Sequence, residues 1–164
     1  APADTYAAWT RACRKAGARV FLDADGDALR EGLAGKPFLV KPNDAELGRL
    51  LGRPVSGDER IVEAARELLG RGVSQVMVSL GGDGVTHDAA LRLRQPAVEV
   101  VSTVGAGDSV VAALAYAADR ALPVEEAVRL AMAVGAATVM RPGTEPARRE
   151  DVDALLPQVQ VEKI

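Results

Sequence analysis

The sequence predicts an α/β protein with a mostly parallel sheet and one antiparallel hairpin. Two short apolar segments, 19–23 and 38–40, flank a helical pattern over 28–34 that is closed by a glycine. A strand, helix and strand in succession imply parallel pairing through a right-handed crossover. A third buried strand, 75–80, breaks at Gly81-Gly82-Asp83-Gly84, and such a glycine-rich turn between strands is typical of a hairpin.

Composition excludes several classes of function. The 164 residues fit one domain, and 48% hydrophobic residues can form a substantial core. A net charge of −3 and 3% aromatic residues offer neither a basic patch nor stacking side chains, so we expect no nucleic-acid partner. The longest uncharged apolar run, 130–140, is too short to span a bilayer and no signal peptide is visible, so we expect no membrane partner.

Single copies of two reactive residue types narrow the chemistry further. Cys13 is the only cysteine, so no intramolecular disulfide can form and we predict a cytoplasmic protein. His87 is the only histidine, which excludes Cys/His zinc sites and argues against a Ser-His triad. We expect His87 to lie on the surface or in the hairpin.

The N-terminal segment 4–16 is predicted to form an amphipathic helix that stops at Gly17. Its predicted apolar face holds Tyr6, Trp9, Cys13 and Ala16, with Trp9 packing rather than binding a ligand. Acidic residues follow the first strand at Asp23, Asp25 and Asp27. The closing Glu of a calcium loop is absent, so we interpret them as a strand-end turn.

Polar residues also follow the strand 38–40, in the run Lys41-Pro42-Asn43-Asp44-Ala45-Glu46. Pro42 keeps Lys41 extended and lets a helix begin at Asn43, so these groups should lie at the carboxyl edge of the sheet, where α/β proteins bind ligands. Asn43 and Glu46 also have the spacing of a capping box, and that local role alone could explain both residues.

The next helix begins at 56–59 and ends at Gly70, with Ile61, Ala64, Ala65, Leu68 and Leu69 on one face. The glycines after the strand 75–80 could let the backbone approach a nucleotide, but a hairpin at Asp83-Gly84 is the preferred interpretation. The alternating segments 85–88 and 90–94 fit an antiparallel addition to the sheet.

A glycine-rich stretch over 101–109 precedes the helical segment that ends near Asp119. Gly105 and Gly107 permit unusual dihedral angles, and their amides lie where a helix begins, which favours a phosphate or a developing oxyanion there. Asp108 beside such a loop could orient and deprotonate an attacking hydroxyl. The alternative is that Gly107-Asp108 only caps the helix.

Pro123 is expected to open another helix, whose small residues allow close packing or room for a flat ligand, with core packing preferred. These residues are Ala131, Ala133, Gly135, Ala136 and Ala137. The loop 141–144 follows, and 151–156 predicts a last helical turn or two.

Three fragments in this order resemble the ribokinase/PfkB family of carbohydrate kinases: Lys41-Pro42-Asn43 with Glu46, Ser79 to Gly84, and Ser102 to Ser109. Each is a weak motif alone, but together, each predicted at a strand end, they are specific and span essentially the whole chain. The chain is most similar to the branch that contains the minor 6-phosphofructokinase, 1-phosphofructokinase and tagatose-6-phosphate kinase. The resemblance implies a ribokinase-like three-layer α/β/α fold.

The resemblance also implies the substrates, ATP and a sugar phosphate, the ion Mg²⁺, and residue roles. Asp108 would be the catalytic base, with Gly105, Ala106 and Gly107 as the anion hole. The implied nucleotide contacts are Lys41, Asn43, Ser79, Gly81, Gly84, Met132 and Ala136. Asn43 and Glu46 would lie near the magnesium and the phosphates. A monovalent cation, K⁺, would lie behind the anion hole at Ser102, Val104, Thr138, Arg141 and Gly143, although Arg141 and Glu145 depart from the expected pattern.

Family members are about twice as long, a size usual for large α/β domains, so residues 1–164 look like a C-terminal half. By this resemblance, the N-terminal strands, the lid strands, the family's substrate-binding Gly-Gly motif and an N-terminal lysine for the phosphates are missing from these residues. We therefore expect weak nucleotide binding, little transfer by this chain alone, an unpaired hydrophobic sheet edge, and the missing half or a second copy as partner.

Two other functions compete with a sugar-phosphate kinase. One is a non-catalytic nucleotide-binding or interaction module derived from such a kinase. The other is a dinucleotide-dependent oxidoreductase, which is disfavoured because no G-x-G-x-x-G opens the first βα unit.

Overall fold

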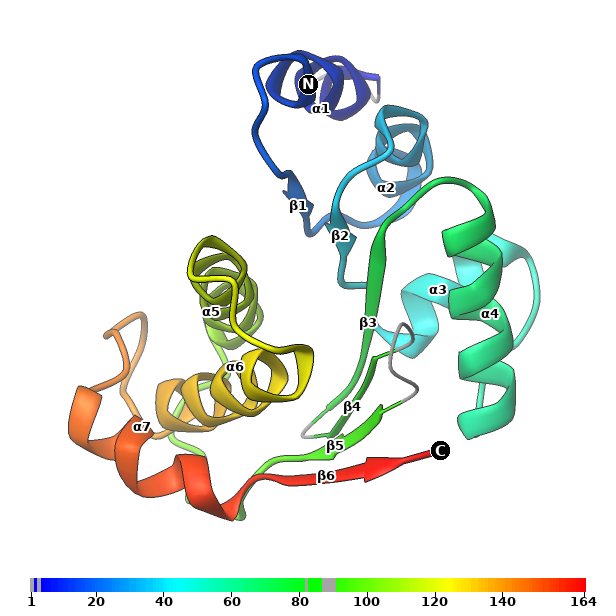
Figure 1. The fold of residues 1–164 in the computed structure, drawn as a ribbon. Coiled ribbons are helices and arrows are strands. Elements are labelled where there is room, and N and C mark those ends of the chain that lie inside the picture. The colour runs from blue at the N-terminus through cyan, green and yellow to red at the C-terminus, as the bar shows by residue number, and fades with distance from the viewer. Residues whose placement is uncertain (1, 3, 82, 87–90) are drawn as a thin grey trace. The chain divides into compact units, whose positions relative to one another are not determined.

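The computed structural model describes residues 2, 4–81, 83–86 and 91–164, which divide into two compact units. The first unit comprises residues 1–90 with Ile164, and the second comprises 91–163 (Figure 1). The first unit contains α1 (Thr5–Lys15), β1 (Phe21–Leu22), α2 (Gly26–Gly32), η1 (Leu33–Gly35), β2 (Leu39–Val40), α3 (Asp44–Leu51), α4 (Asp58–Gly70), β3 (Gln75–Leu80) and β4 (Asp83–Thr86). The second contains β5 (Leu91–Arg94), α5 (Ala106–Asp119), α6 (Val124–Val139), α7 (Arg149–Leu155), η2 (Leu156–Gln158) and β6 (Gln160–Lys163).

The sheet of the first unit has the predicted parallel part. Strand β2 lies between β1 and β3 and is parallel to both, with Leu22 opposite Val40 and Val40 opposite Val76. Within the described residues, β1 pairs with β2 alone, so its other edge carries no strand there. The expected open edge is therefore present, and it is only two residues long.

Helices α2, α3 and α4 cover one face of this sheet (Figure 1). The core there is fully apolar: Leu29, Leu47 and Leu68 are each exposed by 1% or less and pack with Val40 and Val76 of the strands. The predicted face of α4 is confirmed, with Ile61, Ala64, Ala65 and Leu68 buried and Leu69 partly buried.

The predicted apolar face of α1 is wrong. Ala7 and Thr10 are buried, whereas Trp9 is 62% exposed and meets only the edge of the Tyr6 ring, 6.0 Å away between centroids. The reason is the neighbouring backbone: a Cβ on Gly35 would lie 2.5 Å from the Thr10 Cβ. Helix α1 turns Ala7 and Thr10 towards η1, because that distance leaves no room for a ring.

The hairpin is confirmed, but its turn is not where the Asp-Gly pair predicted it. Strands β3 and β4 are antiparallel and Leu80 lies opposite Asp83, so Asp83 and Gly84 already belong to β4. Gly81 has φ of +65°, the left-handed region that a tight turn requires. Gly82 and His87 lie outside the described residues, and so does the prediction for His87.

The second unit is built on the pair α5 and α6, with α7 packed on α6 (Figure 1). The small residues of α6 have the core role: Ala131, Ala133, Gly135, Ala136 and Ala137 are all buried. Strand β6 pairs with β5 in antiparallel fashion, Leu93 opposite Val161, and was not predicted. In the described part of the chain, no helix is long and apolar enough to cross a membrane.

No strand forms over 98–101, although the glycine-rich loop was expected at a strand end. Val100 and Val101 are instead more than half exposed. The amides of Val101 and Ser102 both donate to the carbonyl of Val139, at 2.8 and 3.1 Å. The end of α6 therefore holds this segment in place of a neighbouring strand.

Candidate functional site

The glycine-rich loop turns into α5 at Gly105. Its φ of +78° and ψ of −1° lie in the left-handed region, which residues with a Cβ rarely adopt. Gly105 is the N-cap residue of α5, and its carbonyl accepts the first helical bond, from the Ser109 amide at 2.9 Å. The turn aims the next amides out of the helix end.

Those amides are free to bind an anion. The N–H groups of Gly105, Gly107 and Asp108 donate to no acceptor in the part of the chain that the structure describes. The Ala106 amide makes only a long bond, 3.4 Å, to the Thr103 carbonyl. These donors lie at the positive end of a 14-residue helix, a position that favours an anion.

Asp108 lies in the first turn of α5 and is exposed. Its carboxylate makes no ion pair or hydrogen bond to any described residue. It caps nothing, because the cap position is Gly105 and no side chain bonds there. The capping alternative therefore does not explain this aspartate.

The loop is tied to the segment after α6. The Ser102 hydroxyl donates to the Gly143 carbonyl at 3.2 Å and accepts from the Val104 amide at 3.3 Å. The Arg141 amide donates to the Thr138 carbonyl at 3.0 Å. The five residues expected around a monovalent cation thus lie close together, and their own donors already use two of the carbonyls.

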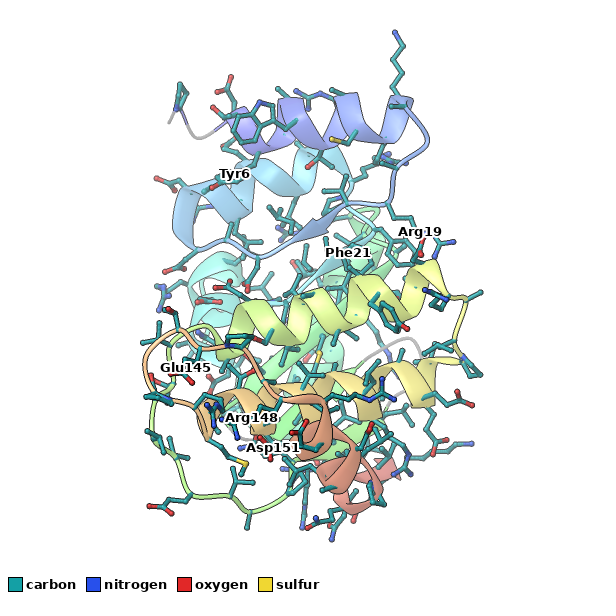
Figure 2. All side chains as sticks on the ribbon, turned by 90° about the vertical axis from the view of Figure 1, so that its left-hand side faces the viewer. Tyr6, Arg19, Phe21, Glu145, Arg148 and Asp151 are labelled. Carbon is teal, nitrogen blue, oxygen red and sulfur yellow. The ribbon has the colours of Figure 1, made fainter. Side chains whose placement is uncertain are left out.

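Arg141 and Glu145 form an ion pair in this segment, with Nη2 and Oε2 2.5 Å apart. Figure 2 shows Glu145 and Arg148 on the segment that leads into α7, and Asp151 in the first turn of α7. The Arg141 side chain is 20% exposed, and its Nε atom is buried without a hydrogen-bond partner among the described residues.

Met132 and Ala136 lie on α6 and are buried, at 5% and 0% exposure. They contribute packing, as the small-residue pattern of this helix also allowed. Their assignment to the adenine remains a prediction.

Two motif fragments meet at the carboxyl end of the sheet in the first unit. The Ser79 amide donates to the Pro42 carbonyl at 3.0 Å, and Asn43 and Ser79 form an isolated parallel bridge. Gly84 lies opposite Ser79 across the hairpin. Ser79, Gly81 and Gly84 therefore share one sheet end with the segment 41–46, as the parallel register predicted.

Lys41 forms an ion pair at the same sheet end, with its Nζ 3.2 Å from Oδ2 of Asp23. The Lys41 side chain is 10% exposed and that of Asp23 is 31% exposed. Asp23 follows β1 and Lys41 follows β2, so the parallel register brings the two together. The sequence analysis missed Asp23 as a partner, and the matching strand-end positions were the available signal.

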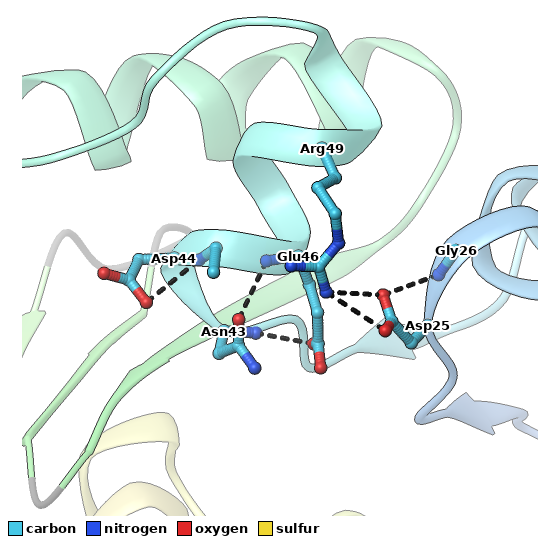
Figure 3. Close-up of polar contacts among 7 residues, drawn as sticks. Asp25, Gly26, Asn43, Asp44, Glu46 and Arg49 are labelled. Carbon is cyan, nitrogen blue, oxygen red and sulfur yellow. Dashed lines mark hydrogen bonds and ion pairs between the residues drawn. The ribbon is translucent and has the colours of Figure 1, made fainter.

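The capping box of α3 is present, as its spacing predicted (Figure 3). The Asn43 Oδ1 accepts from the Glu46 amide at 2.8 Å, and the Glu46 Oε2 accepts from the Asn43 amide at 2.9 Å. The other carboxylate oxygen of Glu46 takes no described partner. The cap therefore uses one carboxylate oxygen of Glu46 and leaves the other able to bind a ligand.

Beside it, Asp25 bridges α2 and α3 (Figure 3). Its two oxygens accept from the Arg49 Nη2 at 2.9 and 3.0 Å, and one also accepts from the Gly26 amide at 2.6 Å. The hydrogen bond from Arg49, followed by that from Gly26, lowers the pKa of Asp25 below its usual value. In the described residues no group of three or more His, Cys, Asp or Glu could hold a metal ion.

A groove in the second unit was not anticipated from the sequence. It has a volume of about 600 Å³ and lies between α5, α6 and α7. Its lining is mostly apolar and includes Ala112, Tyr116, Leu130, Val134 and Pro146. Tyr116 is 54% exposed there, which is unusual for a large side chain next to a core.

An α/β chain with amides that have no described acceptor at a helix N-terminus, and an exposed carboxylate beside them, has the arrangement that suits a phosphate group. The family model described as pfkB family carbohydrate kinase matches residues 1–150. The chain therefore belongs to the pfkB family of carbohydrate kinases.

Relatives agree on this family. A 1-phosphofructokinase of Bacillus subtilis is 40% identical over 166 residues, which is 99% of this chain and 54% of the relative. The structure of phosphofructokinase-2 from Escherichia coli in complex with potassium matches with a TM-score of 0.87 and 32% identity, over 96% of this chain and 53% of that one. A ribokinase of Arabidopsis thaliana, complexed with ribose and ATP, matches with a TM-score of 0.79 and 32% identity, over 94% and 53%.

These matches confirm the predicted ribokinase-like fold. The chain spans about half the length of the curated relatives it matches.

Proposed function

We propose that this chain is the ATP-binding and catalytic part of a kinase that phosphorylates a sugar phosphate, as a phosphofructokinase does. The observation that carries the proposal is the pairing of unoccupied amides at Gly105 and Gly107 with the exposed, unpartnered carboxylate of Asp108. The relatives named phosphofructokinase and the ATP-bound ribokinase support the substrate classes.

In this proposal, Asp108 accepts the proton of the attacking sugar hydroxyl and orients its oxygen. The amides of 105–108 and the positive end of α5 stabilise the negative charge that develops on the transferred phosphoryl group. Three of these four amides, those of Gly105, Gly107 and Asp108, donate to no acceptor among the described residues, and the Ala106 amide makes only the 3.4 Å bond to Thr103, so little rearrangement of the loop is needed. Lys41, buried and positively charged, would lie near the nucleotide phosphates.

Magnesium fits the first unit through Glu46. Its free carboxylate oxygen, with Asn43 beside it, suits an ion that takes one or two protein oxygens and is otherwise held by water and phosphate. When bound, Mg²⁺ would neutralise charge on the phosphates. The capping box would fix the direction in which Glu46 presents its oxygen.

A monovalent cation does not fit the second unit in the same way. The carbonyls of Thr138 and Gly143 accept from Arg141 and Ser102, and a guanidinium stands in the same loop. No step of the proposed reaction is assigned to such an ion.

The rest of the sugar site would come from sequence that this chain does not span. The relatives are almost twice as long as their matched part. Two surfaces are suited to pack against that additional part: the open edge of β1 in the first unit, and the groove around Tyr116 in the second. We expect the 164-residue chain alone to bind ATP weakly and to transfer little phosphate. A stable dimer of it would instead favour a second copy as the partner.

The test of the function is Asp108→Asn in the complete protein, with Asp119→Asn at the other end of α5 as matched control. Loss of the base should lower kcat by about 10²- to 10⁴-fold. The dissociation constant for ATP should stay within a few-fold, because the Asp108 carboxylate forms no hydrogen bond or ion pair with a described residue. Equal turnover of the Asp108 variant and the wild type would favour a non-catalytic nucleotide-binding module.

A further inference from the structure

We infer that the Arg141–Glu145 ion pair takes the place of the monovalent cation that the family resemblance implies, so that this protein has no need of potassium. The inference concerns the loop 141–145, which Ser102 ties to the anion-binding loop. It goes beyond the proposed function and rests on that function only for its activity measurement.

A potassium site is a cage of oxygen acceptors that replaces the hydration shell of the ion. Here two of the candidate carbonyl oxygens already accept from donors of the chain itself. The Thr138 carbonyl accepts from the Arg141 amide at 3.0 Å, and the Gly143 carbonyl accepts from the Ser102 hydroxyl at 3.2 Å. The Ser102 hydroxyl oxygen also accepts a hydrogen bond from the Val104 amide. Each of these internal hydrogen bonds takes up one lone pair that a cage would offer to the ion.

The guanidinium gives this region the opposite polarity to a cation cage. Arginine has five N–H donors, no acceptor, and remains charged at all relevant pH values. The Nε donor of Arg141 is buried and finds no acceptor among the described residues. A buried donor repels a cation, whereas an acceptor would attract it.

Glu145 supplies the counter-charge of the guanidinium that replaces the cation. Its carboxylate lies 2.5 Å from Nη2 of Arg141, four residues earlier, so one short loop supplies both a fixed cation and its counter-ion. The fixed charge remains next to the loop that enters α5 at any salt composition. Arg141→Asn should restore a place for a cation, because it removes the guanidinium and leaves the Glu145 carboxylate without its counter-charge. The amide of residue 141 and the Ser102 hydroxyl keep their hydrogen bonds in this variant.

The experiment compares thermal unfolding of the complete protein in KCl and in tetramethylammonium chloride at equal concentration. A ligand that binds only the folded state raises Tm, and tetramethylammonium is too large for a carbonyl cage. The wild type should show a difference below about 1 °C, and Arg141→Asn should gain a potassium-specific rise of about 2 °C or more. Turnover of the wild type should likewise be equal in the two salts.

The matched control is Arg149→Asn on α7, which removes a similar i, i+4 pair, Arg149 with Asp153, at 2.7 Å. It should gain no response to potassium. A potassium-specific rise of Tm in the wild type would overturn the inference whether or not the protein is a kinase. A folded Arg141→Asn variant that ignores potassium would overturn it as well. If that variant does not fold, the wild-type comparison decides alone.

Discussion

The Lys41 ammonium lies 3.2 Å from the Asp23 carboxylate, and each residue is the first after one of two paired parallel strands. Leu22 and Val40, which precede them, are in register. The pair therefore marks the carboxyl end of the sheet, where the proposed nucleotide phosphates would bind. A buried lysine held by one carboxylate is a fixed positive charge at that position.

Asp23→Asn should destabilise the complete protein by about 1–2 kcal/mol, because it leaves the Lys41 charge buried without a counter-charge, and the partial exposure of Asp23 keeps the loss below that of a fully buried pair. Urea unfolding of Asp23→Asn, Lys41→Met and the double variant measures this coupling. Additivity within about 0.5 kcal/mol would mean that the pair contributes nothing.

Glu46→Gln separates the two roles of the α3 N-terminus. Glutamine keeps an oxygen for the Asn43 amide, so stability should stay within about 0.5 kcal/mol. The lost charge should raise the Mg²⁺ concentration needed for half-maximal activity several-fold. Asn43→Ala is the control for the capping role, because it removes a cap and should lower stability by about 1 kcal/mol. An unchanged Mg²⁺ requirement in Glu46→Gln would leave Glu46 with the capping role only.

Gly135→Ala should disturb the packing of α6 against the N-terminal part of α5. A Cβ on Gly135 would lie 2.8 Å from Cγ2 of Val110, whose branched side chain cannot easily turn away. We expect a loss of about 1–3 kcal/mol from overpacking, partly relieved by Val110→Ala. The loss is read from urea unfolding.

Gly70→Ala serves as the control, since a Cβ there meets nothing within 4 Å and helical alanine is favoured by up to about 1 kcal/mol. Equal stability of the two alanine variants would contradict the close packing of α5 on α6.

Acid should remove the contribution of Asp25. Its pKa is lowered in the folded state by the Arg49 and Gly26 hydrogen bonds, so the unfolded state binds more protons and stability falls as pH drops below about 4. The Tm difference between wild type and Asp25→Asn should favour the wild type at pH 7 and shrink towards pH 3. A difference that does not change with pH would show that Arg49 does not hold the folded carboxylate in its charged form.

The sequence alone determined the features that depend on neighbours within one turn. The capping box needs only Asn43 and Glu46, three residues apart, and the turn into α5 needs only a glycine that tolerates positive φ. The parallel order of the first strands also followed, since the handedness of the crossover leaves little choice. Local sterics and local hydrogen bonds decide such features before any tertiary contact forms.

The tertiary structure decided the features that depend on contacts with segments distant in the sequence. Helix α1 buries Ala7 and Thr10 rather than Trp9 because the Gly35 backbone approaches too closely for a ring. Segment 98–101 is no strand, and the amides at its end, those of Val101 and Ser102, donate to the Val139 carbonyl instead. The Lys41 and Asp23 charges meet only through the register of two strands. Which face is buried and which charges pair depend on distances between segments far apart in the chain, and periodicity within one segment carries no information about those distances.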